Sequence, residues 1–430
     1  MKTTDVIIIG AGAAGLMAAH ILTKKEKKVT VLEARNRIGG RIHTINSDGF
    51  SKPVELGAEF VHGNLPVTLD LLQDAGIKYS RAGFEMWQHH NGTFEQNEEF
   101  IEGWDLLLEK LNRLEHDMTM HDFLEEHFDD ERYFKMRTQI ENFVAGYDTA
   151  DIHDVSAFAL REEWNSQDED DQYRLENGYC TLMDFLAKGL EIHLNSVARE
   201  VNWGEGNVKI VTAANTIYEA PKVIIALPLG ILQAPESTVG AILFNPPLPE
   251  QTQAFNGIGF GSVVKILLEF DEPFWKSDKI KQLTGADLSK MGFLFSDEEI
   301  PTYWTQEPEN SALLTGWIGG PPAYAKRGMT PEAIMEQTVK SLAKVFKLNP
   351  AHLKSRIIAW HVANWSNEPF TLGSYAYEKV ESPQARNVLM YPIADTIYFA
   401  GEYLYDGPSI GTVEAALTSG KETAEKLAKN

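Results

Sequence analysis

The stretch Asp5-Val6-Ile7-Ile8-Ile9-Gly10-Ala11-Gly12-Ala13-Ala14-Gly15-Leu16 decides the fold of this chain. Its four consecutive apolar residues predict a buried parallel strand, and the alanine-rich residues that follow predict a helix. Glycines at G-x-G-x-x-G spacing allow a sharp turn, close approach of the backbone to a pyrophosphate, and close packing of helix on strand. The N-terminus of the helix favours an anion at this turn. The stretch therefore predicts a Rossmann βαβ unit that binds a dinucleotide.

An acidic residue completes this unit. Glu33 ends a second apolar strand, residues 28–32, and follows Gly15 by eighteen positions. A carboxylate at that place accepts the ribose hydroxyl of a dinucleotide and repels a 2′-phosphate. We therefore expect the cofactor to contact Gly10, Gly12, Ala13, Ala14, Gly15, Glu33 and Ala34.

Three arginines and a glycine pair follow Glu33 directly. Arg35 and Arg41, with Gly40 between them, would add donors for phosphate oxygen atoms. A solvated basic loop is the alternative interpretation. NAD sites rarely need such donors, so the segment favours FAD.

Composition limits the class of protein. The chain has 430 residues, of which 43% are hydrophobic and 23% are charged, as is typical of a soluble globular protein with two domains. Its net charge of −23 argues against nucleic acid or an anionic membrane surface as a partner and favours cationic ligands. The single cysteine, Cys180, excludes internal disulfides, and the absence of Cys/His metal spacing predicts no metal site. Since no targeting signal and no membrane-spanning run is found, we expect a soluble cytoplasmic protein.

Four later segments extend the pattern: Leu-Gly-Ala within 54–63, a lysine within 261–275, an aromatic stretch at 360–377, and Phe-Ala-Gly-Glu within 396–416. Together with the N-terminal motif they resemble the flavin-dependent amine oxidase family, the group of monoamine and polyamine oxidases. The resemblance covers nearly the whole chain. It implies an α/β fold with a glutathione-reductase-like FAD-binding domain, which contains the Rossmann βαβ unit, and a discontinuous α+β substrate domain. We expect the FAD-binding domain in residues 1–79, 176–245 and 368–430, and the substrate-binding domain in 80–175 and 246–367.

The resemblance also implies further cofactor contacts. FAD in such proteins would contact Arg35, Gly40, Arg41, Gly57, Ala58, Val197, Gly401, Glu402, Gly411, Thr412 and Val413. Some monoamine oxidases tether the flavin through a cysteine, and Ser374 takes that place here, so we expect non-covalent FAD.

Lys265 stands among aliphatic residues in a predicted strand, residues 261–270. Burying an ammonium group costs free energy unless a partner compensates its charge. We therefore expect a buried Lys265 to have a compensating partner or a function. A lysine on an edge strand whose amine reaches solvent is the alternative. In the family, a lysine at this place holds a water molecule against flavin N5, so the resemblance implies that Lys265 is the catalytic residue.

The resemblance implies an aromatic wall of Trp365 and Tyr375 against which an amine would rest. Monoamine oxidases have a second tyrosine where this chain has Thr412, which predicts a wider pocket suited to extended or polyamine-like amines. Glu59 and His62 are then candidate partners for a distal nitrogen. An ordinary polar pair at a strand end is the alternative.

The expected reaction is oxidation of an amine C–N bond to an imine, with O2 reduced to H2O2. The expected partners are thus a small amine and O2, while the oligomeric state stays open. An L-amino-acid oxidase is one alternative, although Phe60 stands where such enzymes usually carry an arginine. A desaturase or protoporphyrinogen oxidase shares the N-terminal motif but lacks the lysine strand. A catalytically idle flavoprotein that binds a partner is the alternative from a different class.

Overall fold

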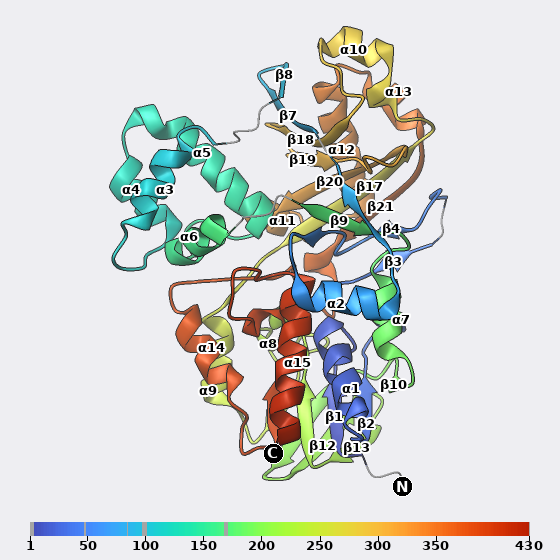
Figure 1. Cartoon of the computed structure of the whole chain (residues 1–430), viewed down its shortest axis with the longest axis vertical. Helices are drawn as coiled ribbons and strands as arrows, with labels where there is room; N and C mark the ends of the chain where they lie inside the picture. The colour runs from blue at the N-terminus through green and yellow to red at the C-terminus, as the bar shows by residue number, and fades with distance from the viewer. Residues whose placement is uncertain (1–3, 47–48, 84, 97–100, 167–170, 430) are drawn as a thin grey trace.

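The computed structural model describes residues 4–46, 49–83, 85–96, 101–166 and 171–429. The lower half of the molecule in Figure 1 contains a five-stranded parallel sheet with the order β10-β2-β1-β14-β23. In that order the strands are Glu191–His193, Val29–Leu32, Val6–Ile9, Lys222–Ile225 and Ile397–Phe399. The sheet therefore joins segments from both ends and the middle of the chain.

Both faces of this sheet are covered, which explains why its strands are apolar at successive positions. Val6 and Ile8 belong to a core with α1 (Ala13–Lys24), α7 (Cys180–Ala187) and α15 (Val413–Lys429). Ile7 and Ile9 face the opposite core, which includes residues of a second sheet with the order β13-β12-β11-β15. In that order its strands are Ile217–Ala220, Asn207–Thr212, Ala198–Gly204 and Leu243–Asn245.

The carboxyl ends of the parallel strands meet at one edge. Ile9 is in register with Leu32 and Ile225, and Ile225 is in register with Phe399. The turns after three of these strands therefore bring Gly10, Glu33 and Gly401 to the same edge. This arrangement confirms the predicted Rossmann βαβ unit and the α/β fold class.

The upper half of the molecule contains a seven-stranded sheet with the order β21-β17-β20-β19-β18-β7-β8. In that order its strands are Ile357–Asn364, Val263–Phe270, Leu313–Gly319, Thr302–Trp304, Met291–Ser296, Glu85–His90 and Thr93–Gln96. β17 lies between two antiparallel neighbours, and all eight of its residues are buried. Helix α12 (Pro331–Val345) contributes its apolar stripe to the core of this half.

A helical lobe lies beside the upper half in Figure 1. It contains α3 (Trp104–Asn112), α4 (Met120–Phe128), α5 (Phe134–Phe143), a π-helix η2 (Val144–Asp148) and α6 (Ala157–Ser166), which share one apolar core. A single turn of π-helix in this position is a common feature of functional sites.

Shorter elements connect these parts. The small strands are β3 (Thr44–Ile45), β4 (Val54–Glu55), β5 (Val61–His62), β6 (Tyr79–Ala82), β9 (Gln172–Leu175), β16 (Gly259–Phe260) and β22 (Ala376–Tyr377). The remaining α-helices are α2 (Pro66–Ala75), α8 (Leu229–Leu232), α9 (Pro249–Asn256), α10 (Asp278–Thr284), α11 (Gly320–Ala325), α13 (Pro350–Ser355) and α14 (Ser382–Met390). The short 3-10 helices are η1 (Glu131–Tyr133), η3 (Phe274–Lys276), η4 (Trp365–Asn367) and η5 (Glu402–Leu404).

The five-stranded sheet draws on all three predicted segments of the FAD-binding domain, and the seven-stranded sheet draws on both predicted segments of the substrate-binding domain. The domain boundaries themselves stay a prediction. Within the described residues, no helix has both the length and the apolar composition that crossing a bilayer requires.

Candidate active site

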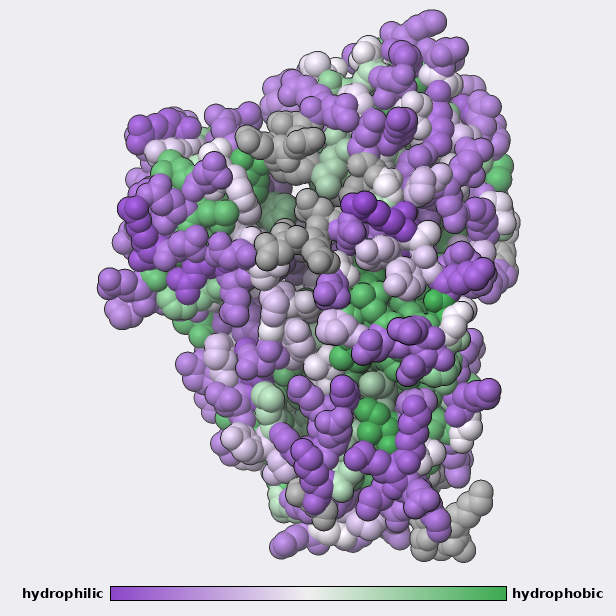
Figure 2. Space-filling model, viewed as in Figure 1, coloured by the Kyte–Doolittle hydropathy of each residue, from purple (hydrophilic) through white to green (hydrophobic). Residues whose placement is uncertain are grey.

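A cavity of about 2520 Å³ runs from the carboxyl edge of the parallel sheet to the seven-stranded sheet and the helical lobe. Figure 2 shows hydrophilic residues over most of one face and a hollow between the helical lobe and the upper half. Every predicted site residue lines this cavity except Gly15. A Cβ at Gly15 would lie 2.0 Å from the Gly10 carbonyl oxygen, so this glycine serves the packing of α1 on β1.

The turn after β1 is shaped for close approach of a ligand. Gly10 has a φ of +107°, and a Cβ there would lie 2.4 Å from the Ala226 carbonyl oxygen. A Cβ at Gly12 would instead enter the cavity, where its nearest neighbour is the Cα of Gly40 at 4.0 Å. No side chain caps α1 at Gly12, so no side chain competes for its first N–H groups. The turn therefore fits the pyrophosphate of a dinucleotide.

The adenosine end of the cavity carries a fixed carboxylate. Glu33 is buried and accepts hydrogen bonds from the backbone N–H groups of Ala11 (2.8 Å) and Arg35 (2.9 Å). Each carboxylate oxygen keeps a free lone pair for a ribose hydroxyl. The Arg35 guanidinium contacts Glu368 and Thr371, but its Nε is buried and has no hydrogen-bond partner among the described residues. An anionic ligand would satisfy this donor, so the residues present fit FAD.

Arg41 and Glu402 form an ion pair in the cavity wall. Arg41 Nη1 lies 2.8 Å from Glu402 Oε1 and 2.5 Å from the Ser374 carbonyl oxygen. The Ala376 N–H donates to the other oxygen of Glu402 at 3.2 Å. The pair links the basic loop to η5, and its contact with the cofactor stays a prediction.

Two segments that carry small residues line the cavity. A Cβ at Gly57 would lie 1.7 Å from the Arg41 carbonyl oxygen, so only glycine fits there. Gly411 and Thr412 precede α15 and lie beside Tyr375, whose Cδ2 would be 2.7 Å from a Cβ at Gly411. Small residues let a flat ring system approach the backbone closely, and Val413, the first residue of α15, lines the same cavity, where the positive end of the helix favours negative charge.

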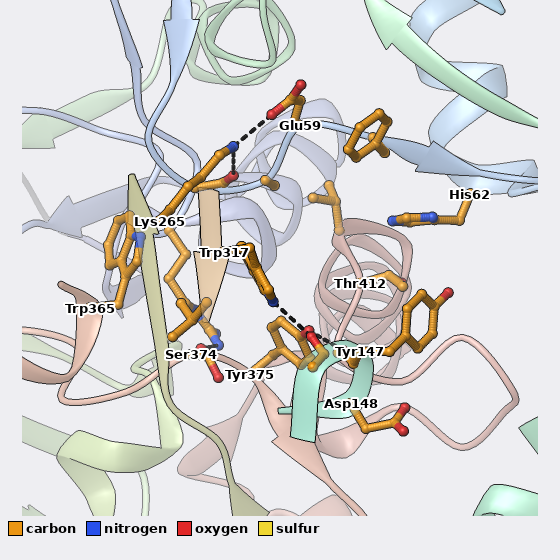
Figure 3. Close-up of a pocket in the computed structure, with 18 of the residues that line it drawn as sticks. Glu59, His62, Tyr147, Asp148, Lys265, Trp317, Trp365, Ser374, Tyr375 and Thr412 are labelled. Atoms are coloured by element: carbon orange, nitrogen blue, oxygen red, sulfur yellow. Dashed lines mark hydrogen bonds and ion pairs between the residues drawn. The ribbon is translucent and has the colours of Figure 1, made fainter. Parts of the chain in front are cut away.

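Lys265 lies on β17 and is 1% exposed. Its Nζ donates to Glu59 Oε2 (2.7 Å) and to the Gly57 carbonyl oxygen (3.1 Å), as Figure 3 shows. Since β17 is paired on both sides, the alternative of an edge-strand lysine that reaches solvent is wrong. Two of the three N–H donors of Lys265 bind protein oxygen atoms, which leaves one donor for a water molecule or ligand.

Glu59 is held by four side chains. Besides Lys265, it accepts hydrogen bonds from Arg174 Nε (3.0 Å), Trp304 Nε1 (3.1 and 3.2 Å) and Gln306 Nε2 (3.2 Å). Burial by itself raises the pKa of Glu59, but Lys265 and Arg174 outweigh burial and lower the pKa to about 2. The carboxylate has no acceptor site left for a distal substrate nitrogen. The geometry therefore supports a different role from the one expected, that of the counter-ion which positions Lys265.

His62 lines the cavity close to Phe60 and Tyr147, with ring centroids 5.9 and 6.4 Å away. Burial lowers the pKa of His62 to about 4, so the imidazole is neutral at pH 7. Its Nδ1 is buried and finds no hydrogen-bond partner in the described part of the chain. This nitrogen fits the predicted role of a polar contact for substrate.

Trp365 and Tyr375 both line the cavity, and each is held by a different hydrogen bond. Trp365 packs behind Gly57 and donates from Nε1 to the Leu56 carbonyl oxygen at 2.9 Å, on the Lys265 side of Figure 3. Tyr375 lies near Thr412 and donates from its hydroxyl to the Tyr147 carbonyl oxygen. Contact of both aromatic side chains with one substrate stays a prediction.

Several further residues line the cavity that were not expected from the sequence. Trp317 pairs with Lys265 across β20 and β17, and its Nε1 donates to the Gly146 carbonyl oxygen at 2.7 Å. Tyr147 and Asp148 come from the π-helix η2, and all three residues line the cavity. The place of Trp317 opposite Lys265 depends on which strands pair, and a π-helix leaves no local pattern that predicts it, so neither could be identified from the sequence.

Comparison with known proteins agrees with this geometry. The family model for flavin-containing amine oxidoreductases matches residues 13–428. The chain is 30% identical to lysine-specific histone demethylase 2 of Homo sapiens, over 99% of this chain and 53% of that protein. It is 26% identical to polyamine oxidase 4 of Oryza sativa subsp. japonica, over 99% of this chain and 88% of that protein. The chain thus spans about half the length of the demethylases it matches.

Two solved structures share the fold. A putrescine oxidase bound to putrescine superposes with a TM-score of 0.81 at 22% identity, covering 100% of this chain and 99% of that chain. A cyclohexylamine oxidase from Brevibacterium oxydans IH-35A gives a TM-score of 0.79 at 20% identity, with 99% of both chains covered.

Proposed function

The chain belongs to the flavin-containing amine oxidoreductases, and from this premise we propose that it oxidises a C–N bond of an amine to an imine while O2 is reduced to H2O2. A bound FAD would supply the redox chemistry, by accepting a hydride equivalent from the amine α-carbon. The observation that carries the proposal is the buried Lys265–Glu59 pair beside Gly57, in the same cavity as the dinucleotide turn.

The residues of this chain would hold FAD without a covalent bond. The Gly10–Gly15 turn, Glu33 and Arg35 fit the dinucleotide part, and the segments at Gly57 and Gly411 fit the ring. Ser374 Oγ lies 2.8 Å from Thr149 Oγ1, and a serine cannot form a thioether. The flavin should therefore leave the protein on denaturation.

Lys265 would position a water molecule in the cavity, and the aromatic residues would bind the amine. With Glu59 as counter-ion, the remaining N–H of Lys265 would hold a water molecule at a fixed place in the cavity. The rings of Tyr147, Trp317 and Tyr375 offer faces that attract a cation on entry and pack on alkyl carbon after proton loss.

An L-amino-acid oxidase would need a free cation to hold the substrate carboxylate. Phe60 occupies the expected place, and the guanidinium of Arg174 lies 4.5 Å from the Phe60 ring centroid. Arg174 already donates to Glu59 and to the carbonyl oxygen atoms of Thr305 (2.8 Å) and Glu307 (3.1 Å). All three guanidinium nitrogen atoms of Arg174 thus donate hydrogen bonds to protein oxygen atoms. This supports an amine over an amino acid as the substrate.

The test is a peroxide assay of the purified flavoprotein with alkylamines, diamines, polyamines and L-amino acids. The proposal predicts H2O2 release with amines and an aldehyde or imine product. Release with L-amino acids alone, or with no compound while flavin is bound, would contradict it.

A further inference from the structure

Two carboxyl groups line the cavity in the helical lobe, and the reaction proposed above does not use them. Asp148 is the last residue of η2, and Glu163 lies on α6. Asp148 is 8% exposed, and Glu163 is half-buried with its side chain on the cavity wall. Figure 3 shows Asp148 beyond Tyr147, at the opposite end of the pocket from Lys265.

Among the described residues, no ion pair joins this acidic pair to a cation. The charge of Glu163 acts on Asp148, and Asp148 Oδ2 is buried and accepts no hydrogen bond from the described residues. Lys135 lines the cavity on the neighbouring helix α5, but its Nζ is paired with Glu102 at 3.1 Å. Buried carboxylate oxygens are normally satisfied by a donor, so a ligand that brings N–H groups fits this place.

The space between the acidic pair and Lys265 has aromatic walls. Tyr147 precedes Asp148 directly and stacks on Phe143 with ring centroids 5.5 Å apart, and Tyr375 donates to the Tyr147 carbonyl oxygen. Aromatic faces accommodate a methylene chain and attract an ammonium group that passes along them. The same cavity thus joins a reaction site, an apolar passage and an anionic end.

We propose that Asp148 and Glu163 bind the second, non-reacting ammonium group of a diamine or polyamine whose other nitrogen is oxidised beside Lys265. An ammonium has three donors and can satisfy Asp148 Oδ2 and Glu163 together. This inference rests on the proposed amine oxidation and names the class of amine.

The charge state of the pair supports this assignment. Burial raises the pKa of Glu163 to about 7, and burial together with the charge of Glu163 raises the pKa of Asp148. Two carboxyl groups that share a site disfavour each other's charged form. An ammonium group bound between them would oppose this effect and favour the charged carboxylates. The −23 net charge of the chain adds long-range attraction for such a dication.

The test compares α,ω-diamines with n-alkylamines of the same carbon number, using kcat/KM from H2O2 release. Wild-type protein should prefer the diamine at the best chain length by at least about tenfold, and Asp148→Asn should lower this ratio by at least about tenfold. Glu162→Gln is the matched control, because Glu162 is an exposed neighbour on α6 and its change removes the same charge. The control should keep the wild-type ratio.

The outcomes separate this inference from the proposed function. Wild-type protein that oxidises monoamines without preferring diamines would overturn the inference and leave amine oxidation standing. Failure of every amine to reduce the flavin would overturn both. If Asp148→Asn does not retain flavin, Glu163→Gln provides the same comparison, and a ratio equal to that of Glu162→Gln would overturn the inference.

Discussion

Glu59 Oε2 lies 2.7 Å from Lys265 Nζ, and both side chains are buried between the seven-stranded sheet and the Leu56–Ala58 segment. The carboxylate compensates the ammonium, which explains how a lysine can stand in the centre of an apolar strand. It also fixes Nζ beside Gly57, at the place where the flavin ring is expected.

Removal of this counter-ion should destabilise the protein. Glu59→Gln leaves the Lys265 ammonium buried without its partner, and loss of one member of a buried pair costs about 3–5 kcal/mol. Urea unfolding with flavin bound should show this loss. Glu309→Gln is the control, since the Glu309–Lys52 pair is about half exposed and should contribute at most about 1 kcal/mol. Equal stability of the two variants would contradict the assigned role of Glu59.

The same carboxylate should affect stability at low pH. Lys265 and Arg174 hold the pKa of Glu59 at about 2 in the folded protein, against burial, compared with an ordinary value of 4.5. A depressed pKa contributes stability above the ordinary value, and this contribution is lost as the pH falls toward the folded value. The difference in Tm between wild type and Glu59→Gln should therefore shrink as the pH falls below 4.5. A difference that stays constant from pH 6 to pH 3 would contradict this prediction.

Flavin should separate from the denatured chain. Ser374 stands where a tether would attach, and its hydroxyl is hydrogen-bonded to Thr149. Acid precipitation followed by centrifugation should leave the yellow colour in the supernatant, with the chromatographic mobility of FAD. Flavin that stays with the precipitated protein would refute non-covalent binding.

The contribution of a long-range helix cap to the free energy of unfolding should also be measurable. Glu414 of α15 accepts hydrogen bonds from Val67 N (2.9 Å), Thr68 N (2.7 Å) and Thr68 Oγ1 (2.7 Å) at the start of α2, where Leu65 provides no cap. Glu414→Ala should cost about 1–2 kcal/mol in urea unfolding, the range for loss of an N-cap. Glu422→Ala, at an exposed position of the same helix, is the control. A loss no larger than that of the control would rule out the cap.

Local patterns could predict the parallel sheet and the dinucleotide turn, because glycine spacing and apolar strands are set by residues near one another in sequence. They also identified Lys265, since a charge within an apolar strand is visible in the sequence itself. They could not assign the role of Glu59, because its partners Arg174 and Trp304 are 115 and 245 residues away. The acidic pair was missed for a similar reason, since it depends on how η2 packs against α6.

Anaerobic stopped-flow reduction of the flavin by an amine, followed by reoxidation with O2, tests the central claim about Lys265 most directly. Lys265→Met removes the charge with little change in volume, and Lys290→Met at an exposed position is the control. We predict that Lys265→Met retains flavin but slows reduction or reoxidation by at least about tenfold, or about 1.4 kcal/mol of barrier, while the control matches wild type. Wild-type rates in both half-reactions of Lys265→Met would contradict a catalytic role of Lys265.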